Sequence, residues 1–162
     1  MTSAEIELAV VRYFDARRNM IVPNVTWGFG LNYECDLLML SASGYVTEIE
    51  IKVSRSDLLA DKKKRKHRLW ESGYSSGKRI IKYFYFAIPD QLESSISDVP
   101  ERAGVIIVDG HGRCTTVRKP IMNRDARKAT DAQRIHLGHL AAMRIWNLKN
   151  KLVQHATQKE NH

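Results

Sequence analysis

The run from Tyr45 to Val53 constrains the fold of this chain more than any other stretch. In a β-strand its residues alternate between two faces, so that Glu48, Glu50 and Lys52 share one face and the intervening isoleucines take the other. Burying charged side chains is costly unless they are paired or bind a metal. Three ionisable groups on one face of a strand that we expect at the centre of the sheet therefore indicate a functional site.

A second β-rich run, Cys35 to Leu40, precedes this strand, and the residues Ser41 to Gly44 between them are typical of a turn. The two runs predict a hairpin with Asp36 near Glu50. Close carboxylates repel each other without a cation, and Mg²⁺ prefers carboxylate, carbonyl and water oxygens at about 2.1 Å. Asp36 and Glu50 are therefore candidate ligands, with Lys52 about 7 Å along the strand. The alternative is a solvated or cross-strand pair of Glu50 and Lys52, with Asp36 a turn residue.

Helices and further strands are predicted around this hairpin. The residues Thr2 to Glu5 form a capping box that starts a helix running to about Arg18. The other expected elements are a first strand at Trp27 to Tyr33, a helix from Ser54 or Ser56 to Leu69 and Trp70, a strand at Ile80 to Ile88, a hairpin of Val105 to Val108 and Cys114 to Arg118, and a long helix at about Asp131 to Val153. We expect one α/β domain over residues 1–162, with its core at about 3–118 and its C-terminal helix at about 131–153.

The charge of the chain favours a polyanionic partner, either nucleic acid or an anionic membrane surface. Lys and Arg number 26 against 18 Asp and Glu, which gives a formal charge of +8. Six cations crowd into one segment: Lys62, Lys63, Lys64, Arg65, Lys66 and Arg68. Alone, such a run can also be a solvated helix face or a nuclear-import signal. Acidic residues at the start of the chain, the lack of a long apolar run and the two cysteines lead us to expect a cytoplasmic protein.

Asp36, followed after 13 residues by Glu50-Ile51-Lys52, resembles the signature of the PD-(D/E)XK nuclease superfamily. The expected order of elements resembles the restriction-endonuclease-like αβββαβ core of that superfamily. Three longer blocks, at residues 50–61, 83–89 and 103–109, are similar in order and spacing to its MmcB-related DNA-repair family. The chain departs from the pattern at Cys35, where the signature has Pro, and at the basic run with the Ser/Gly-rich residues 72–77 behind it.

This resemblance implies a Mg²⁺-dependent deoxyribonuclease of a bacterium or phage that acts in DNA repair or processing, with a mixed central sheet flanked by helices. Asp36 and Glu50 would hold Mg²⁺ together with the carbonyl of Ile51, Mn²⁺ could substitute, and Lys52 would orient the attacking water. Many relatives add a carboxylate from the first helix. Glu7 is expected in that role, because it falls on the apolar arc of the helix, and a salt-bridged or snorkelling glutamate is the alternative.

The remaining polar residues of interest each have a structural alternative. Glu5 has a capping role, and Glu48 is either a further ligand or a strand residue that faces solvent. Arg55 is expected to contact DNA phosphate together with the basic run, and the alternative is an ion pair with Asp57 or Asp61. His136 and His139 are best explained as a structural pair, His111 as a loop residue and Cys35 as a small buried hydrophobe.

The alternative function is a catalytically inactive nucleic-acid-binding protein that keeps the nuclease fold. The presence of Asp36, Glu50 and Lys52 together favours the enzyme, because a pure binder gains by losing carboxylates that repel phosphate. DNA remains the expected partner, and membrane binding through the basic run lacks the apolar opposite face that an interfacial helix needs. The last helix, with Trp146, could belong to the core or to the seam of a homodimer.

Overall fold

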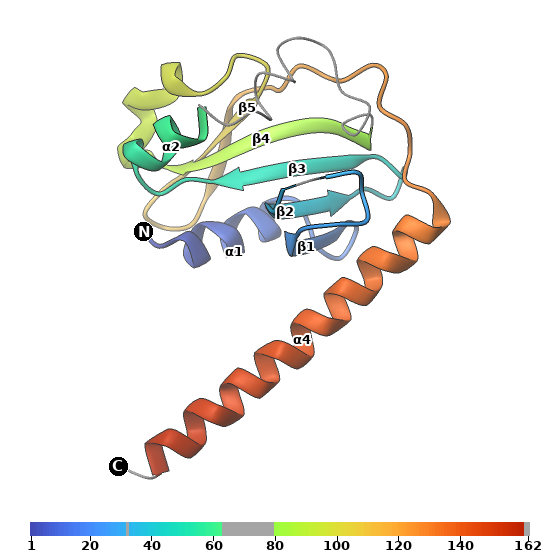
Figure 1. Cartoon of the computed structure of the whole chain (residues 1–162). Coiled ribbons are helices and arrows are strands. Elements are labelled where there is room, and N and C mark those ends of the chain that lie inside the picture. Colours follow the sequence, from blue (N-terminus) through green and yellow to red (C-terminus); the bar gives the residue numbers. More distant parts are fainter. Residues whose placement is uncertain (32, 63–79, 161–162) are drawn as a thin grey trace.

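The chain folds around a six-stranded mixed sheet with the strand order β1-β2-β3-β4-β5-β6 (Figure 1). The computed structural model describes residues 1–31, 33–62 and 80–160. Its strands are β1 (Met20–Val25), β2 (Cys35–Leu40), β3 (Val46–Ile51), β4 (Ile81–Pro89), β5 (Gly104–Val108) and β6 (Cys114–Arg118). Its helices are α1 (Ser3–Tyr13), α2 (Arg55–Lys62), the 3-10 helix η2 (Asp90–Asp98) and α4 (Asp131–Glu160). This architecture confirms the predicted α/β fold with a C-terminal hairpin and a long last helix.

The three central strands run parallel, and the outer strands run antiparallel to their neighbours. β3 pairs with β4 and β4 with β5 in parallel register, connected through α2 and η2. Parallel strands are usually buried on both faces, and all residues of β5 and of β3 are buried here. β3 is unusual because two of its six buried residues are Glu48 and Glu50.

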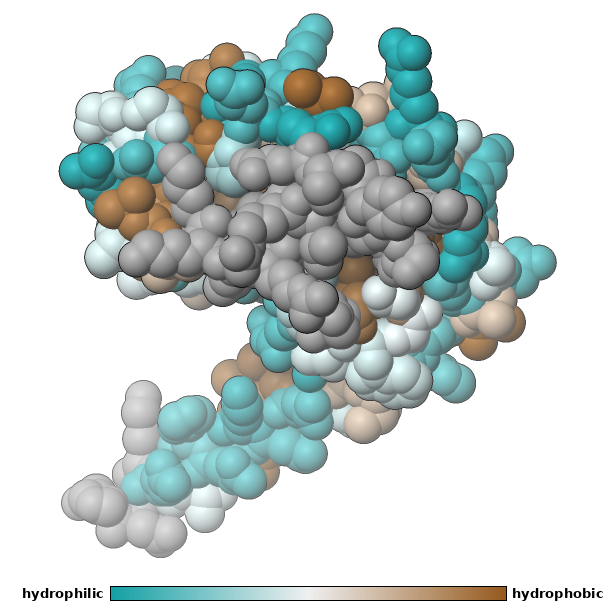
Figure 2. Space-filling model, turned by 45° about the horizontal axis from the view of Figure 1, so that its top comes forward, coloured by the Kyte–Doolittle hydropathy of each residue, from teal (hydrophilic) through white to brown (hydrophobic). Residues whose placement is uncertain are grey.

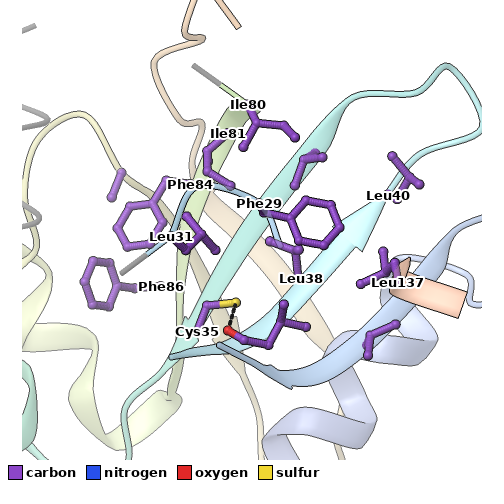
Figure 3. Packing of buried hydrophobic residues seen from close by; sticks show 14 of the residues in the cluster. Phe29, Leu31, Cys35, Leu38, Leu40, Ile80, Ile81, Phe84, Phe86 and Leu137 are labelled. Carbon is purple, nitrogen blue, oxygen red and sulfur yellow. Dashed lines mark hydrogen bonds between the residues drawn. The ribbon is translucent and has the colours of Figure 1, made fainter. Parts of the chain in front are cut away.

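Each face of the sheet has its own hydrophobic core. Helix α1 covers one face, where Ile6, Ala9 and Val10 contact apolar residues of β2, β3 and β5. On the opposite face, Leu137 of α4 joins a larger cluster with Phe29 and Leu31 (Figure 3). Leu58 of α2 belongs to the same cluster. The buried thiol of Cys35 donates to the carbonyl of Val25 at 3.4 Å on the same face, as expected for a small buried residue.

The first strand differs from the prediction. β1 is formed by Met20–Val25, whereas the strand expected at Trp27 to Tyr33 was wrong. Pro23 has no backbone N–H to donate. It is tolerated because β1 is an edge strand, and no further strand pairs with its outer side. The positive φ angles of Gly28 (91°) and Gly30 (70°) turn the following segment back over the sheet, so its alternating apolar residues fill the core without pairing as a strand.

Two helix boundaries also differ. Helix α1 has the predicted capping box but ends at Tyr13, because Phe14 caps it and Asp15 follows with a φ of 51°. Helix α4 continues to Glu160, beyond the predicted end near Val153, and the sequence between these residues contains no Gly or Pro to stop it. Trp146 on α4 is 60% exposed, so it is not part of the core. Among the described residues, no helix is both long and apolar enough to cross a membrane.

Candidate active site

Strands β2 and β3 bring Asp36, Glu50 and Lys52 together. Leu37 is paired with Ile49, so the next step of the antiparallel register sets Asp36 opposite Glu50. The Lys52 Nζ lies 3.1 Å from Oε2 of Glu50 and 4.0 Å from Oδ2 of Asp36. One ammonium thus contacts two carboxylates and supplies a cation that offsets their mutual repulsion.

The backbone fixes the position of this cluster. The amide of Ile51 donates a 2.7 Å hydrogen bond to Oδ2 of Asp36, and the amide of Lys52 donates to the carbonyl of Ala87 on β4 at 3.0 Å. Asp36 is therefore tied to the strand that bears Glu50, and Lys52 is tied to the next strand. The parallel β3–β4 pairing and the β2–β3 hairpin meet at this point.

Burial divides the cluster into an enclosed part and an accessible part. Glu50 is 2% exposed and Lys52 is 5% exposed, whereas 40% of the Asp36 side chain is exposed. A ligand from solvent would therefore meet Asp36 first. The enclosed ammonium and carboxylate interact more strongly than a surface pair would, because less water screens them.

A second buried carboxylate, Glu48, lies on the same strand and is fully buried. The hydroxyl of Tyr33 donates a 2.7 Å hydrogen bond to its Oε2. Burial raises the pKa of Tyr33 well above its ordinary value, and the neighbouring Glu48 raises it further. Tyr33 therefore remains a protonated donor at neutral pH. Sequence patterns did not single out Tyr33, because the loop that holds it reaches Glu48 only through the tertiary fold.

The two glutamates of α1 have different surroundings. Glu5 accepts a 2.6 Å hydrogen bond from the Thr2 amide in the capping box, and this bond lowers its pKa. Glu7 is half-buried, and its burial raises its pKa, with a further increase from the charge of Asp36. Of the two glutamates, Glu7 is therefore the one whose carboxyl group interacts with the charge of Asp36.

The oxygen atoms of this site suit Mg²⁺, which commonly binds one or two carboxylates and keeps several waters. Asp36 and Glu50, together with the carbonyl of Ile51, the residue after Glu50, provide ligands of this kind, and the partial exposure of Asp36 gives access. Over residues 1–31, 33–62 and 80–160, no three or more His, Cys, Asp and Glu side chains form a group that could hold a metal ion. Asp36 and Glu50 are two carboxylates, and an ion bound to them would keep water on its remaining positions.

The predicted DNA-binding residues are only partly described. Nε of Arg55 lies 3.0 Å from Oδ2 of Asp98 on η2, a partner that the sequence did not indicate, and 65% of its side chain remains exposed. Lys62 is the last residue of α2. Lys63, Lys64, Arg65, Lys66 and Arg68 lie outside the described residues, as do Leu69 and Trp70 at the predicted helix end.

The three histidines considered as candidates from the sequence, His111, His136 and His139, are not part of the cluster of Asp36, Glu50 and Lys52. His136 of α4 packs against Trp27, with ring centroids 4.1 Å apart, and His139 is exposed. His111 lies in the β5–β6 turn, where its amide donates to Asp109 at 2.9 Å. These placements agree with structural and loop roles.

Comparison with known proteins gives one family and one solved structure. A family model described as "DNA repair protein MmcB-like" matches residues 1–151. A protein of unknown function from Silicibacter pomeroyi has a similar structure, with a TM-score of 0.60 and 21% sequence identity over 100% of this chain and 95% of that one. At that identity the likeness shows the fold alone. None of the curated proteins matches the sequence.

Proposed function

Because the chain belongs to the MmcB-like DNA repair protein family, we propose that it is a metal-dependent nuclease that hydrolyses phosphodiester bonds of DNA. The observation that supports this proposal is the contact of Lys52 with both Glu50 and Asp36. Structural ion pairs also occur in proteins, but this one combines an enclosed ammonium with a carboxylate that solvent reaches.

In this proposal each residue has a definite role. Asp36 and Glu50, with the carbonyl of Ile51, would hold Mg²⁺ or Mn²⁺. When bound, the ion supplies Lewis-acid stabilisation of the charge that develops on the phosphate. Lys52 orients the attacking water and donates to the phosphate oxygens, since its ammonium offers three donors and is already positioned by Glu50. Glu7 adjusts the electrostatics of Asp36 from α1.

The deciding experiment is a cleavage assay on plasmid and labelled oligonucleotides, with Mg²⁺, with Mn²⁺ and with excess chelator. The wild-type protein should cut DNA only with a divalent metal, and Asp36→Asn should abolish cutting. Asn retains an oxygen that can accept the Ile51 amide bond, so loss of activity would not reflect loss of the fold. Cleavage that survives the chelator, or full activity of Asp36→Asn, would contradict the proposed mechanism.

The second candidate function is DNA binding without turnover. One observation favours it: Glu50 and Lys52 form an enclosed ion pair that offsets their charges without a metal. In that case wild-type protein and Asp36→Asn should bind DNA and neither should cut it in either metal. The same assay, read together with a binding titration, therefore distinguishes the two functions.

A further inference from the structure

A second group of cations surrounds the β2–β3 turn, at the opposite end of β3 from Lys52. A cavity of about 410 Å³ lies there, with Arg17, Arg18 and Arg134 among its lining residues and Ser41 beside them. Guanidinium groups and hydroxyls are the donors that proteins use to bind phosphate. We call the five cations around this turn, namely Arg17, Arg18, Lys82, Lys128 and Arg134, the turn surface.

Tyr45 holds two members of the turn surface close together. Nζ of Lys82 lies 4.1 Å from the centre of the Tyr45 ring, and Nζ of Lys128 lies 5.5 Å from it. Each ammonium is attracted by the ring, but the two ammoniums repel each other. An anion bound between them would relieve that repulsion.

The backbone connects these cations to the turn. The amide of Ala129 donates to the carbonyl of Gly44 at 2.9 Å, which places Lys128 beside the turn. Nη2 of Arg134 lies only 2.5 Å from the position that a Cβ on Gly44 would occupy, so the guanidinium packs directly on the turn. Lys82 is fixed through its own carbonyl, which accepts from the Asn123 amide at 2.9 Å.

Nearby acids only partly balance these charges. Asp15 lies 3.2 Å from Arg17 and 3.4 Å from Arg18, whose side chains are 93% and 84% exposed. Asp131 lies 3.9 Å from Arg134 and is fully exposed. Exposed ion pairs of this kind are weak, because water screens them. The arginines are therefore available to another anion, and cations exceed acids on this surface.

We propose that the turn surface binds the phosphate backbone of nucleic acid, as a contact separate from the cluster at Asp36. The cations come from four segments and extend over more area than one phosphate group covers, which favours a polymer of phosphates over a single small anion. The proposal rests on the proposed function only in taking DNA as the ligand. Tyr45 lies just before β3, five residues from Glu50. Along an extended strand these five residues span about 17 Å, which is the length of about five base pairs of duplex DNA. A DNA that contacts both regions must extend at least that far beyond the cleavage site.

The test is a salt titration of binding to a labelled DNA duplex in chelator, so that cutting does not interfere. The variant replaces Arg17, Arg18 and Lys128 with Gln. A matched control replaces three exposed cations elsewhere, Arg12, Arg113 and Lys119, with Gln. The first variant should bind more weakly, and its slope of log K against log salt should fall by about 0.9 for each phosphate that is no longer neutralised. The control should keep the wild-type slope.

Equal effects of the two triple variants would overturn the proposal, because general charge would then explain binding. It would also be overturned if the turn-surface variant lost binding to anionic vesicles but kept binding to DNA. Both readouts are independent of cleavage. An inactive protein that still shows the expected slopes would contradict the nuclease proposal and support this one.

A different observation concerns the distal half of α4, which stands clear of the body in Figures 1 and 2. Every residue from Ile145 to Gln158 is exposed. Five apolar side chains in this half are 58–65% exposed: Ile145, Trp146, Leu148, Leu152 and Val153. Most helical stability in proteins comes from packing of an apolar face, so we expect a partner surface to cover these side chains.

The spacing of these residues points to a helical partner. Ile145, Leu148 and Leu152 follow one another at intervals of three and four, the repeat of helices that pack along a common seam.

We propose that this seam pairs with the same seam of a second copy of the chain. The distal half extends beyond the body, so two copies can meet along it with their bodies at opposite ends (Figure 1). The segment 145–158 contains Lys149 and Lys151 but no acidic residue. Pairing of two such helices depends on apolar contacts against charge repulsion, so added salt should strengthen it. An acidic partner, a membrane or nucleic acid held by these lysines would show the opposite salt dependence.

Sedimentation of the full chain over a range of protein and salt concentrations tests this. The wild type should form a dimer that tightens with salt, Leu148→Glu should be monomeric, and Gln154→Glu should dimerise like the wild type. Gln154→Glu is the matched control, because it adds the same negative charge at an exposed position of α4 that faces away from the seam. A wild-type monomer at all concentrations, or an equal loss in both variants, would overturn the proposal.

Discussion

The backbone amide of Ile51 donates a 2.7 Å hydrogen bond to Oδ2 of Asp36. This bond crosses from β3 to β2 and orients the most accessible carboxylate of the cluster. The same residue, Ile51, buries its side chain on the face that α1 covers, so the core on one side of the sheet helps to fix the position of the charged cluster.

The two simplest substitutions of Asp36 should therefore differ in stability. Asp36→Asn keeps an acceptor for the Ile51 amide, whereas Asp36→Ala leaves that amide without its carboxylate partner, at a cost of about 1–3 kcal/mol. Urea unfolding of both variants measures this difference, and both should lack cleavage activity. Equal stabilities would mean that the hydrogen bond adds little.

The enclosed pair of Glu50 and Lys52 predicts strong coupling. Removing one partner of a buried ion pair typically costs about 3–5 kcal/mol, because the other charge stays buried without compensation. Glu50→Gln and Lys52→Met should each destabilise the protein, and the double variant should lose clearly less than the sum of the two. Denaturant unfolding of the four proteins in the cycle measures the coupling. Additive losses would show that the 3.1 Å contact contributes little to folding.

The raised pKa of Glu7 predicts that the stability of the protein depends on pH. Its folded-state pKa is raised above the ordinary value of 4.5, so the folded protein binds a proton more readily and stability falls as pH rises through that range. Glu7→Gln removes this penalty. The variant should therefore be more stable than the wild type at neutral pH and similar to it below the ordinary pKa. Thermal unfolding across pH measures the effect.

Glu5 provides the matched control, because its pKa is lowered by the Thr2 hydrogen bond. Its carboxylate contributes stability above the ordinary pKa of 4.5, and that contribution is lost as pH falls through the lowered folded value. Glu5→Gln should therefore be no more stable than the wild type at neutral pH.

Glu7 also predicts an effect on cleavage. If its carboxylate contributes to metal binding, Glu7→Gln should lower the cleavage rate and raise the Mg²⁺ concentration that cleavage needs, whereas Glu5→Gln should change neither. Equal Mg²⁺ titrations would return Glu7 to a structural role.

Gly104 predicts a steric effect at the start of β5. A Cβ at this position would lie 2.5 Å from the Tyr85 ring and 2.9 Å from Cδ of Pro120. Gly104→Ala should destabilise the protein by about 1–3 kcal/mol, the usual cost of overpacking. Gly110→Ala, where a Cβ meets no atom within 4 Å, should change stability by less than about 0.5 kcal/mol. Urea unfolding of the pair tests the contrast.

The parts of the fold that depend on local sequence could be predicted. The capping box of Thr2 and Glu5, the β2–β3 hairpin and the β5–β6 turn at Asp109 each follow from residues within a few positions of one another. The alternation that puts Glu50 and Lys52 on one face is local too. The family was also identified correctly from short blocks of sequence.

The parts that depend on distant contacts could not be predicted. Phe29 and Leu31 alternate like strand residues, but glycine conformations turn them onto the sheet from a loop. The bonds of Tyr33 with Glu48 and of Arg55 with Asp98 join residues 15 and 43 positions apart. The sequence suggested that the carboxylates need a metal, and it did not reveal that Lys52 would contact both of them.

The contact between α4 and β1 has a consequence for solubility. Arg144 donates to the carbonyls of Pro23 at 3.3 Å and Asn24 at 2.5 Å. β1 is an edge strand, and an edge with open carbonyls can recruit a strand from another molecule. Pro23 offers no N–H, and the guanidinium occupies acceptors beside it, so this edge is a poor template for further pairing. We therefore expect Arg144, a single residue of the long helix, to disfavour pairing of β1 with a strand of another molecule.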